Sequence, residues 1–186
     1  MTLPIELDDR FRSAAAAEGL LDVAYDVADS PIGPLLLAAS ERGVCRISFN
    51  PEPEAALEAL ARAHGVRVLR SPRPLDELRH QLNDYFEGRR RDFDVAVDTS
   101  VLPAFQQLVL EELARVPYGE LATYGGLAAR IGRPRAARAV GGALNRNPIP
   151  IVLPCHRIVG ASGKLVGYAG GLDRKEQLLR LEGAVL

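Results

Sequence analysis

Residues 134–160 read PRAARAVGGALNRNPIPIVLPCHRIVG, and this stretch decides how the second half of the 186-residue chain folds. Pro134 suits the first turn of a helix, which we expect to run to about Asn145. Asn147-Pro148 then predicts a turn, and Ile149–Leu153 is a short apolar run typical of a strand. A helix, a turn and a strand therefore lead directly into the Pro154-Cys155 pair.

The predicted helix has two unlike sides. At about 100° per residue, three apolar residues share one side: Ala137, Val140 and Leu144. The opposite side is basic, polar or small: Arg135, Arg138, Gly142, Asn145 and Arg146. Five arginines and no acidic residue lie between Arg130 and Arg146. Such a face can approach a phosphate backbone and place a guanidinium in a groove, whereas many exposed arginines are simply solvated. These residues alone leave both interpretations open.

Two more helices are predicted before this one. Ala104–Arg115 has helical spacing and ends before Pro117-Tyr118-Gly119. Leu121–Ile131 carries a second apolar stripe and is closed by Gly132. Two short helices joined by a glycine-containing turn are typical of a helix-turn-helix, although many helical hairpins share the pattern.

The first half of the chain has a different pattern. Three apolar runs separated by turn residues predict an antiparallel meander: Leu21–Ala28, Pro34–Ala39 and Gly43–Phe49. Further helices are predicted at Glu54–His64 and Leu75–Phe86, and further strands at Val66–Leu69 and around Phe93, Val95 and Val97. Residues 1–19 are expected to form a helical or loose extension. We therefore predict an α+β chain with two domains, residues 1–98 and 99–186.

Charge is divided unevenly along the chain, on either side of Val97. The chain has a formal net charge of −1, but residues 98–186 hold 11 Lys+Arg against 7 Asp+Glu, and the remainder holds 12 against 17. A basic half of this kind points to contact with nucleic acid or a membrane surface. The sequence shows no secretory signal and no apolar run long enough to span a membrane. We expect a cytoplasmic protein that does not contact membranes.

The segment Pro154-Cys155-His156-Arg157 has the residue types of a nucleophilic site. A reactive thiol needs partial exposure, a rigid mount and an environment that favours the thiolate. Here the proline fixes the backbone, and His156 and Arg157 supply positive potential. Adjacent side chains on an extended chain point to opposite faces, so we expect His156 to act on Cys155 through a water. Glu182 is a candidate for orienting the imidazole.

Each cysteine also has a plainer interpretation. Most free cysteines are small buried hydrophobic residues, and we keep that interpretation for Cys45, which lies inside a predicted strand. A disulfide framework is not indicated by two distant cysteines. The two cysteines and three histidines have no spacing suited to zinc. We expect no metal and no cofactor.

Taken together and in order, the motifs of the second half resemble those of the O6-alkylguanine-DNA alkyltransferase family. The most specific is Pro154-Cys155-His156-Arg157-Ile158-Val159. The others are Phe105-Gln106, Val116-Pro117-Tyr118-Gly119, Tyr124, Ala136–Ala143, Asn147-Pro148, Tyr168, Gly170-Gly171-Leu172 and Glu182-Gly183. The first half matches more weakly, mainly through Ser30–Leu35.

The resemblance implies a fold and a reaction. The implied fold is a ribonuclease-H-like antiparallel sheet with helices, followed by a mainly helical domain with a winged helix-turn-helix-like DNA-binding motif. The implied substrate is O6-alkylguanine in double-stranded DNA, with O4-alkylthymine as a second one. A monomer flips the damaged nucleotide and takes the alkyl group irreversibly onto Cys155. A lesion that pairs poorly costs less to extrude than a normal base.

The resemblance also implies catalytic roles. Cys155 accepts the alkyl group after His156, Glu182 and a water have removed its proton. Tyr124 assists rotation of the nucleotide and donates a proton to the departing guanine. Arg138 fills the gap that the flipped nucleotide leaves.

Other residues are expected to shape the DNA contact and the base pocket. The further DNA contacts are Arg135, Ala137, Gly141 and Asn145. The hinge between the helix-turn-helix and the cysteine turn is Asn147. The remaining pocket residues are Leu144, Pro154, Arg157, Ile158, Tyr168 and Ala169, with the carbonyls of Cys155 and Ile158 reading the exocyclic amine of guanine.

Several positions depart from the family pattern. Leu110 stands where many members have tryptophan, which changes packing and leaves the chemistry intact. Ala169 replaces a pocket serine of some relatives, a change that bears on the range of alkyl groups accepted. The zinc ligands of some eukaryotic members are not evident.

Three other functions fit parts of the sequence. A helix-turn-helix regulator would bind duplex DNA sequence-specifically and tolerate Cys155→Ala, and a Cys-His hydrolase would turn over ester or peptide substrates without DNA. Neither explains the arginine face and the cysteine segment together. A non-catalytic damage binder is the nearest alternative, and it is disfavoured because cysteine rather than tryptophan occupies the acceptor position.

Overall fold

The computed structural model describes residues 14, 18–49 and 53–184. The chain folds as two compact units, and the boundary between them falls inside a helix. The first unit comprises Met1–Asp84 and Asp94–Val101, and the second comprises Tyr85–Phe93 and Leu102–Leu186. The extension expected at residues 1–19 lies almost entirely outside the described residues.

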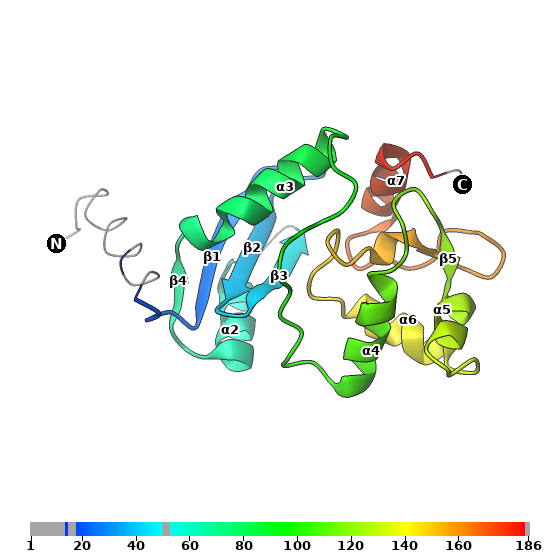
Figure 1. Ribbon diagram of the computed structural model, residues 1–186, viewed down its shortest axis with the longest axis horizontal. Coiled ribbons are helices and arrows are strands. Elements are labelled where there is room, and N and C mark those ends of the chain that lie inside the picture. Colours follow the sequence, from blue (N-terminus) through cyan, green and yellow to red (C-terminus); the bar gives the residue numbers. More distant parts are fainter. Residues whose placement is uncertain (1–13, 15–17, 50–52, 185–186) are drawn as a thin grey trace. The chain divides into compact units, whose positions relative to one another are not determined.

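The first unit is built on a four-stranded sheet (Figure 1). Its strands are β1 (Val23–Ala28), β2 (Leu35–Ser40), β3 (Gly43–Phe49) and β4 (Val68–Arg70), in the order β3-β2-β1-β4. The first three strands are antiparallel neighbours, so the predicted meander is confirmed. The fourth strand begins at Val68 rather than Val66 and pairs parallel to β1, which makes the sheet mixed.

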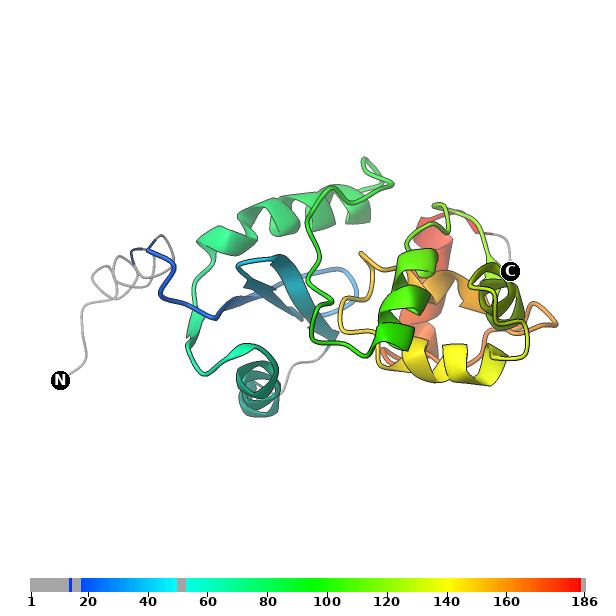
Figure 2. The same cartoon turned by 60° about the horizontal axis from the view of Figure 1, so that its bottom comes forward.

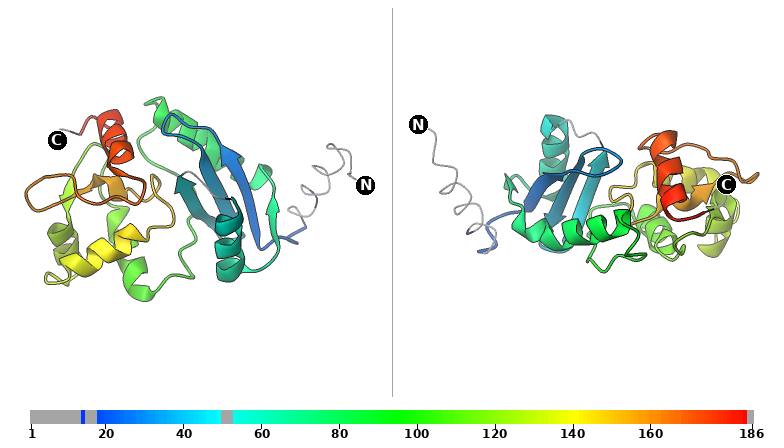
Figure 3. Two further views of the ribbon diagram at one scale, coloured as in Figure 1. Left: turned by 180° about the vertical axis from the view of Figure 1, so that it is seen from behind. Right: turned by 90° about the horizontal axis from the view of Figure 1, so that it is seen from above.

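Two helices cover the two faces of this sheet (Figure 3). They are α2 (Pro53–His64) and α3 (Asp76–Phe86), and a short 3-10 turn, η1 (Arg73–Leu75), leads into the second. A core cluster forms between the sheet and α2: Val23, Leu36, Ala38, Cys45, Ala56 and Leu60. Burial raises the pKa of the Cys45 thiol to about 12, so Cys45 is a core residue, as predicted.

The strand predicted around Phe93, Val95 and Val97 does not form. The segment makes a single β-bridge, between Val44 and Val97. The Asp94 amide donates instead to the side chain of Gln81 on α3, at 2.8 Å. The alternating pattern therefore marks an extended segment that is hydrogen-bonded to α3 at Asp94 and to Val44 of β3 at Ala96 and Asp98.

The second unit is mainly helical (Figure 2). Its elements are α4 (Ala104–Leu113), β5 (Ala122–Thr123), α5 (Tyr124–Arg130), α6 (Ala137–Asn145), η2 (Cys155–Arg157), β6 (Ile158–Val159) and α7 (Leu172–Leu181). The two short strands pair in parallel. The buried faces of α4, α5 and α6 form one core: Val109, Leu110, Leu113, Leu127, Ala128, Val140, Ala143 and Leu144. The two units together confirm the predicted α+β class.

Two helices begin later than predicted. α6 starts at Ala137 because Pro134 and Arg135 form a separate turn, closed by a hydrogen bond from the Ala136 amide to the Arg133 carbonyl at 2.8 Å. α5 starts at Tyr124 rather than Leu121 because the Thr123 hydroxyl caps it, accepting from the Gly126 amide at 3.0 Å.

The apolar run Ile149–Leu153 is a tight turn and not a strand. The Leu153 amide donates to the Ile149 carbonyl at 2.9 Å. Ile151 has a φ of 76°, in the left-handed region that a branched residue rarely adopts. The run is apolar because Ile149, Ile151 and Leu153 are buried, and burial alone does not distinguish a strand from a buried turn.

Within the part of the chain that the structure describes, no helix combines the length and apolar character needed to cross a bilayer.

Gly43 is expected to be essential for the β2–β3 turn. Its φ is 133°, and a Cβ there would lie 2.3 Å from the Ala96 carbonyl oxygen. We expect Gly43→Ala to lower the unfolding free energy by about 2–5 kcal/mol, from positive φ and overpacking together. Gly88 also has a positive φ, 71°, but open space around it, so Gly88→Ala should cost only about 1–2 kcal/mol. Urea unfolding of both variants measures the difference, and equal losses would contradict the steric argument.

Candidate active site

Cys155 stands at the first residue of η2, held by short-range hydrogen bonds. Its amide donates to the Leu153 carbonyl at 2.8 Å, and its own carbonyl accepts from the Ile158 amide. The Asn147 side chain donates to the Leu153 carbonyl at 2.9 Å and to the Cys155 Sγ at 3.2 Å. Asn147 Oδ1 also accepts from the Ile149 amide at 3.0 Å. One asparagine thus ties the turn after α6 to the thiol.

The thiol opens onto a cavity of about 400 Å³. Its walls come from the start of α5, from α6 and from the glycine-rich loop before α7: Tyr124, Gly141, Gly142, Leu144, Asn145, Cys155, Val166, Gly167, Tyr168 and Ala169. A Cβ at Gly141 would lie 3.7 Å from the Tyr124 ring. The absence of that Cβ keeps the cavity open between α6 and Tyr124.

The surroundings of Cys155 do not favour a thiolate, contrary to the expectation from sequence. The residue is 7% exposed. Burial raises the pKa of the thiol to about 11, although the hydrogen bond from Asn147 and the charge of Lys175 act to lower it. At neutral pH the sulfur is therefore protonated, and its reaction as a nucleophile needs a base.

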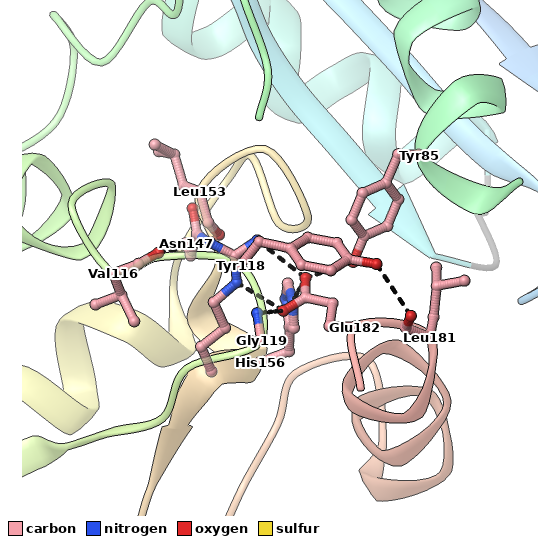
Figure 4. Close-up of polar contacts among 10 residues, drawn as sticks. Tyr85, Val116, Tyr118, Gly119, Asn147, Leu153, His156, Leu181 and Glu182 are labelled. Carbon is pink, nitrogen blue, oxygen red and sulfur yellow. Dashed lines mark hydrogen bonds and ion pairs between the residues drawn. The ribbon is translucent and has the colours of Figure 1, made fainter. Parts of the chain in front are cut away.

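His156, the residue that follows Cys155, forms a buried pair with Glu182 (Figure 4). Both side chains are fully buried, and His156 Nε2 lies 2.8 Å from Glu182 Oε1. The carboxylate selects the tautomer that carries its proton on Nε2. Nδ1 is also buried and has no hydrogen-bond partner among the described residues. Because η2 is a helical turn, the extended geometry that we assumed for Cys155 and His156 is wrong.

The Glu182 carboxylate is saturated with donors. Arg157 donates to Oε2 through Nε at 2.8 Å and to Oε1 through Nη2 at 2.9 Å. The Gly119 amide donates to Oε2 at 3.3 Å, and the Tyr85 hydroxyl donates to Oε1 at 2.7 Å. Burial acts to raise the pKa of Glu182, but the hydrogen bonds from His156 and Arg157 lower it to about 2. Glu182 is thus a fixed anion that orients His156 and does not itself take a proton.

Burial also keeps His156 uncharged. It lowers the pKa of the imidazole and outweighs the opposite effect of Glu182. The ring is therefore neutral at pH 7, with Nδ1 as its unprotonated nitrogen. A neutral imidazole near a protonated thiol can act as a general base.

The prediction that Arg157 is a pocket residue is wrong, because it does not line the cavity. It is 5% exposed and binds Glu182 and, through Nη1, the Val116 carbonyl at 2.6 Å. Its positive charge is paired with the buried Glu182 carboxylate. The positive charge that acts on the thiol comes instead from Lys175.

Lys175 is a site residue that sequence reasoning missed. It is fully buried, and its ammonium donates to the Ile158 carbonyl at 2.5 Å and to the Val166 carbonyl at 3.0 Å. Its spacing from Leu178, Leu179 and Glu182 places all four on one face of α7, at positions i, i+3, i+4 and i+7. A lysine and a glutamate on an otherwise apolar helix face were the available signal.

The carbonyls of Cys155 and Ile158 each already accept one hydrogen bond, from the Ile158 amide and from Lys175 respectively. A carbonyl oxygen has two lone pairs. Any donor on a bound base would have to use the second one.

α6 presents the two sides that its sequence predicts. Val140 and Leu144 are buried, and Ala137 is half-buried. The exposed residues are Arg135, Arg138, Asn145 and Arg146. Gln106 of α4 binds the end of the helix, donating to the Arg146 carbonyl at 2.9 Å.

The predicted site residues thus fall into three groups. The cavity brings together Tyr124, Gly141, Leu144, Asn145, Cys155, Tyr168 and Ala169. Outside the cavity, Asn147 is half-buried and donates to the thiol, and five residues are buried: Pro154, His156, Arg157, Ile158 and Glu182. Arg135, Ala137 and Arg138 lie outside the cavity, at the start of α6. Gly142, Val166 and Gly167 line the cavity but were not among the predicted residues.

Two family models match the chain. The ribonuclease-like domain of 6-O-methylguanine DNA methyltransferase matches residues 23–99. The DNA-binding domain of 6-O-methylguanine DNA methyltransferase matches residues 104–184.

Individual relatives match most of the chain. A methylated-DNA–protein-cysteine methyltransferase from Methanosarcina acetivorans is 44% identical over 160 residues, which is 86% of this chain and 98% of that protein. One from Mycobacterium tuberculosis is 44% identical over 158 residues, 85% of this chain and 91% of that protein. The crystal structure of Mycobacterium tuberculosis OGT in complex with DNA has a TM-score of 0.76 and 43% identity, covering 86% of this chain and 92% of that one.

Removing the Glu182 charge is expected to destabilise the protein strongly. Glu182→Gln leaves the buried Arg157 guanidinium without its anion, at a cost of about 3–5 kcal/mol. Glu176→Gln on the same helix is the control, because the Glu176–Arg180 pair is exposed, with side chains 42% and 75% accessible. The control should lose no more than about 0.5 kcal/mol. Urea unfolding at pH 7 compares them, and similar small losses would refute the buried-charge argument.

The same comparison has an expected pH dependence. The pKa of Glu182 falls from 4.5 to about 2 on folding, so its contribution to stability is complete above pH 4.5 and disappears as the pH falls toward 2. The gap between wild type and Glu182→Gln should shrink over this interval.

Proposed function

Because the chain belongs to the 6-O-methylguanine DNA methyltransferase family, we propose that it repairs DNA by moving an alkyl group from guanine O6 onto its own Cys155. The substrate is double-stranded DNA that carries O6-alkylguanine, and O4-alkylthymine is a second substrate. The observation that carries the proposal is a thiol at the edge of a cavity, with a neutral imidazole and a fixed carboxylate behind it. The protein works as a monomer in the cytoplasm, on nucleoid DNA.

α6 is the element that enters the DNA. Its exposed side supplies Arg138 and Asn145, the turn before it supplies Arg135, and the small residues Ala137 and Gly141 allow close approach to the duplex. Arg138 occupies the space left by the flipped nucleotide. Extrusion costs a few kcal/mol for a normal base and less for a lesion that pairs poorly. The flipped base enters the cavity between Tyr124 and Tyr168, and Asn147 links this helix to the cysteine turn.

The proton of the thiol passes through a water to Nδ1 of His156. Three observations support this step: the raised pKa of the thiol, the neutral imidazole, and the buried Nδ1 with no partner among the described residues. Throughout this step Nε2 keeps its proton and donates it in a hydrogen bond to Glu182. His156 and Cys155 are thus both uncharged before the reaction, and the thiolate forms only when His156 takes the proton.

The sulfur then attacks the alkyl carbon, and the bond between that carbon and O6 breaks. Tyr124 protonates the departing guanine. Burial raises the pKa of this phenol, which keeps it protonated as a donor. The proton held by His156 returns to Tyr124 through water, so the products are a thioether on Cys155 and an unmodified guanine.

Each molecule acts once. A thioether is removed only by another nucleophile or a metal, and Cys155 is the sole thiol among the residues that line the cavity. The second cysteine of the chain, Cys45, lies in the sheet of the other unit. The reaction therefore ends with an alkylated protein.

The stoichiometry is directly testable. Wild-type protein mixed with excess duplex carrying O6-methylguanine should gain one methyl group, and peptide mapping should place it on Cys155. Cys155→Ala should gain none. Intact mass, together with the number of repaired bases, measures the ratio. More than one repaired base per protein molecule would rule out single turnover.

Arg138 should matter only when the substrate is a duplex. We expect Arg138→Ala to slow repair of duplex O6-methylguanine at least about tenfold, because the flipped state loses its support. Reaction with free O6-benzylguanine should change little. Arg180→Ala, which removes an exposed arginine of α7, is the charge-matched control and should affect neither reaction. Equal losses on both substrates would contradict the proposal that Arg138 occupies the space left by the flipped nucleotide.

A further inference from the structure

Tyr85 is a buried tyrosine whose hydroxyl reaches the candidate active site. It lies in the last turn of α3 and is completely inaccessible to solvent. Its ring packs against Phe86, Phe93 and Tyr118, with centroids 5.3–6.1 Å apart. Such a cluster would accommodate phenylalanine equally well, so the packing does not explain the hydroxyl.

The hydroxyl donates to the oxygen that orients the histidine. Tyr85 Oη lies 2.7 Å from Glu182 Oε1, and the same oxygen lies 2.8 Å from His156 Nε2 (Figure 4). The other oxygen, Oε2, accepts from Arg157 Nε and the Gly119 amide. Tyr85 and the His156 imidazole therefore donate to the same oxygen, Oε1, whereas the Gly119 amide donates to Oε2.

We propose that Tyr85 is a positioning residue of this site, whose hydroxyl holds Glu182 Oε1 so that the His156 ring keeps Nδ1 available to the Cys155 thiol. The proposal rests on the proposed function of His156 as the base. A hydrogen bond from Tyr85 withdraws negative charge from Oε1, which weakens the pull of the carboxylate on the imidazole. The ring then remains neutral and keeps an accepting nitrogen.

The sign of the effect follows from the charges around the ring. Glu182 favours the imidazolium, whereas Arg157 and Lys175 disfavour it. Near Tyr85 the charged and titratable groups are Glu182, Arg157 and Tyr118, and Arg91 lies over the Tyr118 ring. Loss of the Tyr85 hydroxyl removes one hydrogen-bond donor from the Glu182 carboxylate and leaves Arg157 and Lys175 in place. The imidazolium form should become more favourable.

The test is the titration of His156 in Tyr85→Phe. With ¹⁵N-labelled histidine, NMR of the full chain should show the pKa of His156 rising by about one pH unit relative to wild type. The acid limb of O6-benzylguanine transfer should move upward by the same interval, because less His156 remains neutral at each pH on that limb. Binding of undamaged duplex should be unchanged.

Tyr118→Phe is the matched control. Its hydroxyl donates to the Leu181 carbonyl at 3.0 Å and makes no hydrogen bond to the Glu182 carboxylate among the described contacts. It removes a hydroxyl from the same aromatic cluster, and it should leave the pKa of His156 unmoved. A shift as large as that of Tyr85→Phe would overturn the proposal, because it would assign the effect to the cluster as a whole.

A second substitution covers the case in which Tyr85→Phe does not fold. 3-Fluorotyrosine at position 85 keeps the hydroxyl and makes it a more acidic, stronger donor. It should lower the pKa of His156, the direction opposite to Tyr85→Phe. An unchanged or raised pKa in this variant, or an unchanged pKa in Tyr85→Phe, overturns the role of Tyr85.

Failure of the proposed function has a different signature. If wild-type protein takes no alkyl group from O6-benzylguanine or damaged duplex, Cys155 is not the acceptor. The His156 titrations of the free protein still decide whether the Tyr85 hydroxyl controls the imidazole, because they require no substrate.

Discussion

The second unit depends on a buried carboxylate that cannot be left without partners. Glu182 follows α7, and the groups that donate to it come from three separate places: η2, the end of α3 and the Gly119 backbone in the turn before β5. A buried charge is costly unless it is paired and hydrogen-bonded. The unit must therefore bring these segments together in one arrangement, and that arrangement places His156 behind the cysteine.

Burial keeps the Cys155 thiol in its protonated, less reactive form. The Cys155 thiol is buried and protonated, and a protonated thiol is a poor nucleophile and resists oxidation. The means of activating it are already present in the neutral imidazole and the nearby Lys175 ammonium. A protein that is proposed to react once benefits from this arrangement, because any unwanted reaction of the sulfur would consume the molecule.

α6 connects the surface that we propose to face DNA with the cavity that holds Cys155. Its buried side packs Val140 and Leu144 into the core, its exposed side carries Arg138, and the turn before it carries Arg135. Gly141 and Leu144 line the cavity next to the thiol. Directly after the helix, Asn147 donates to the sulfur. One helix of nine residues and the turn that follows it thus contribute to the proposed DNA contact, to the cavity wall and to the cysteine mount.

The sequence by itself determined the α+β class, the meander, the helix-turn-helix and the two sides of α6, because each depends on local periodicity that neighbouring residues set. It also singled out Cys155, His156 and Glu182 through a motif of specific residue types. Only the tertiary structure decided that Phe93–Val97 is not a strand, that Ile149–Leu153 is a turn, and that Cys155 has a raised pKa. It alone placed Lys175 and Tyr85 beside the site. Hydrogen-bond partners and burial depend on residues far apart in the chain, and local pattern contains no record of which distant segments meet.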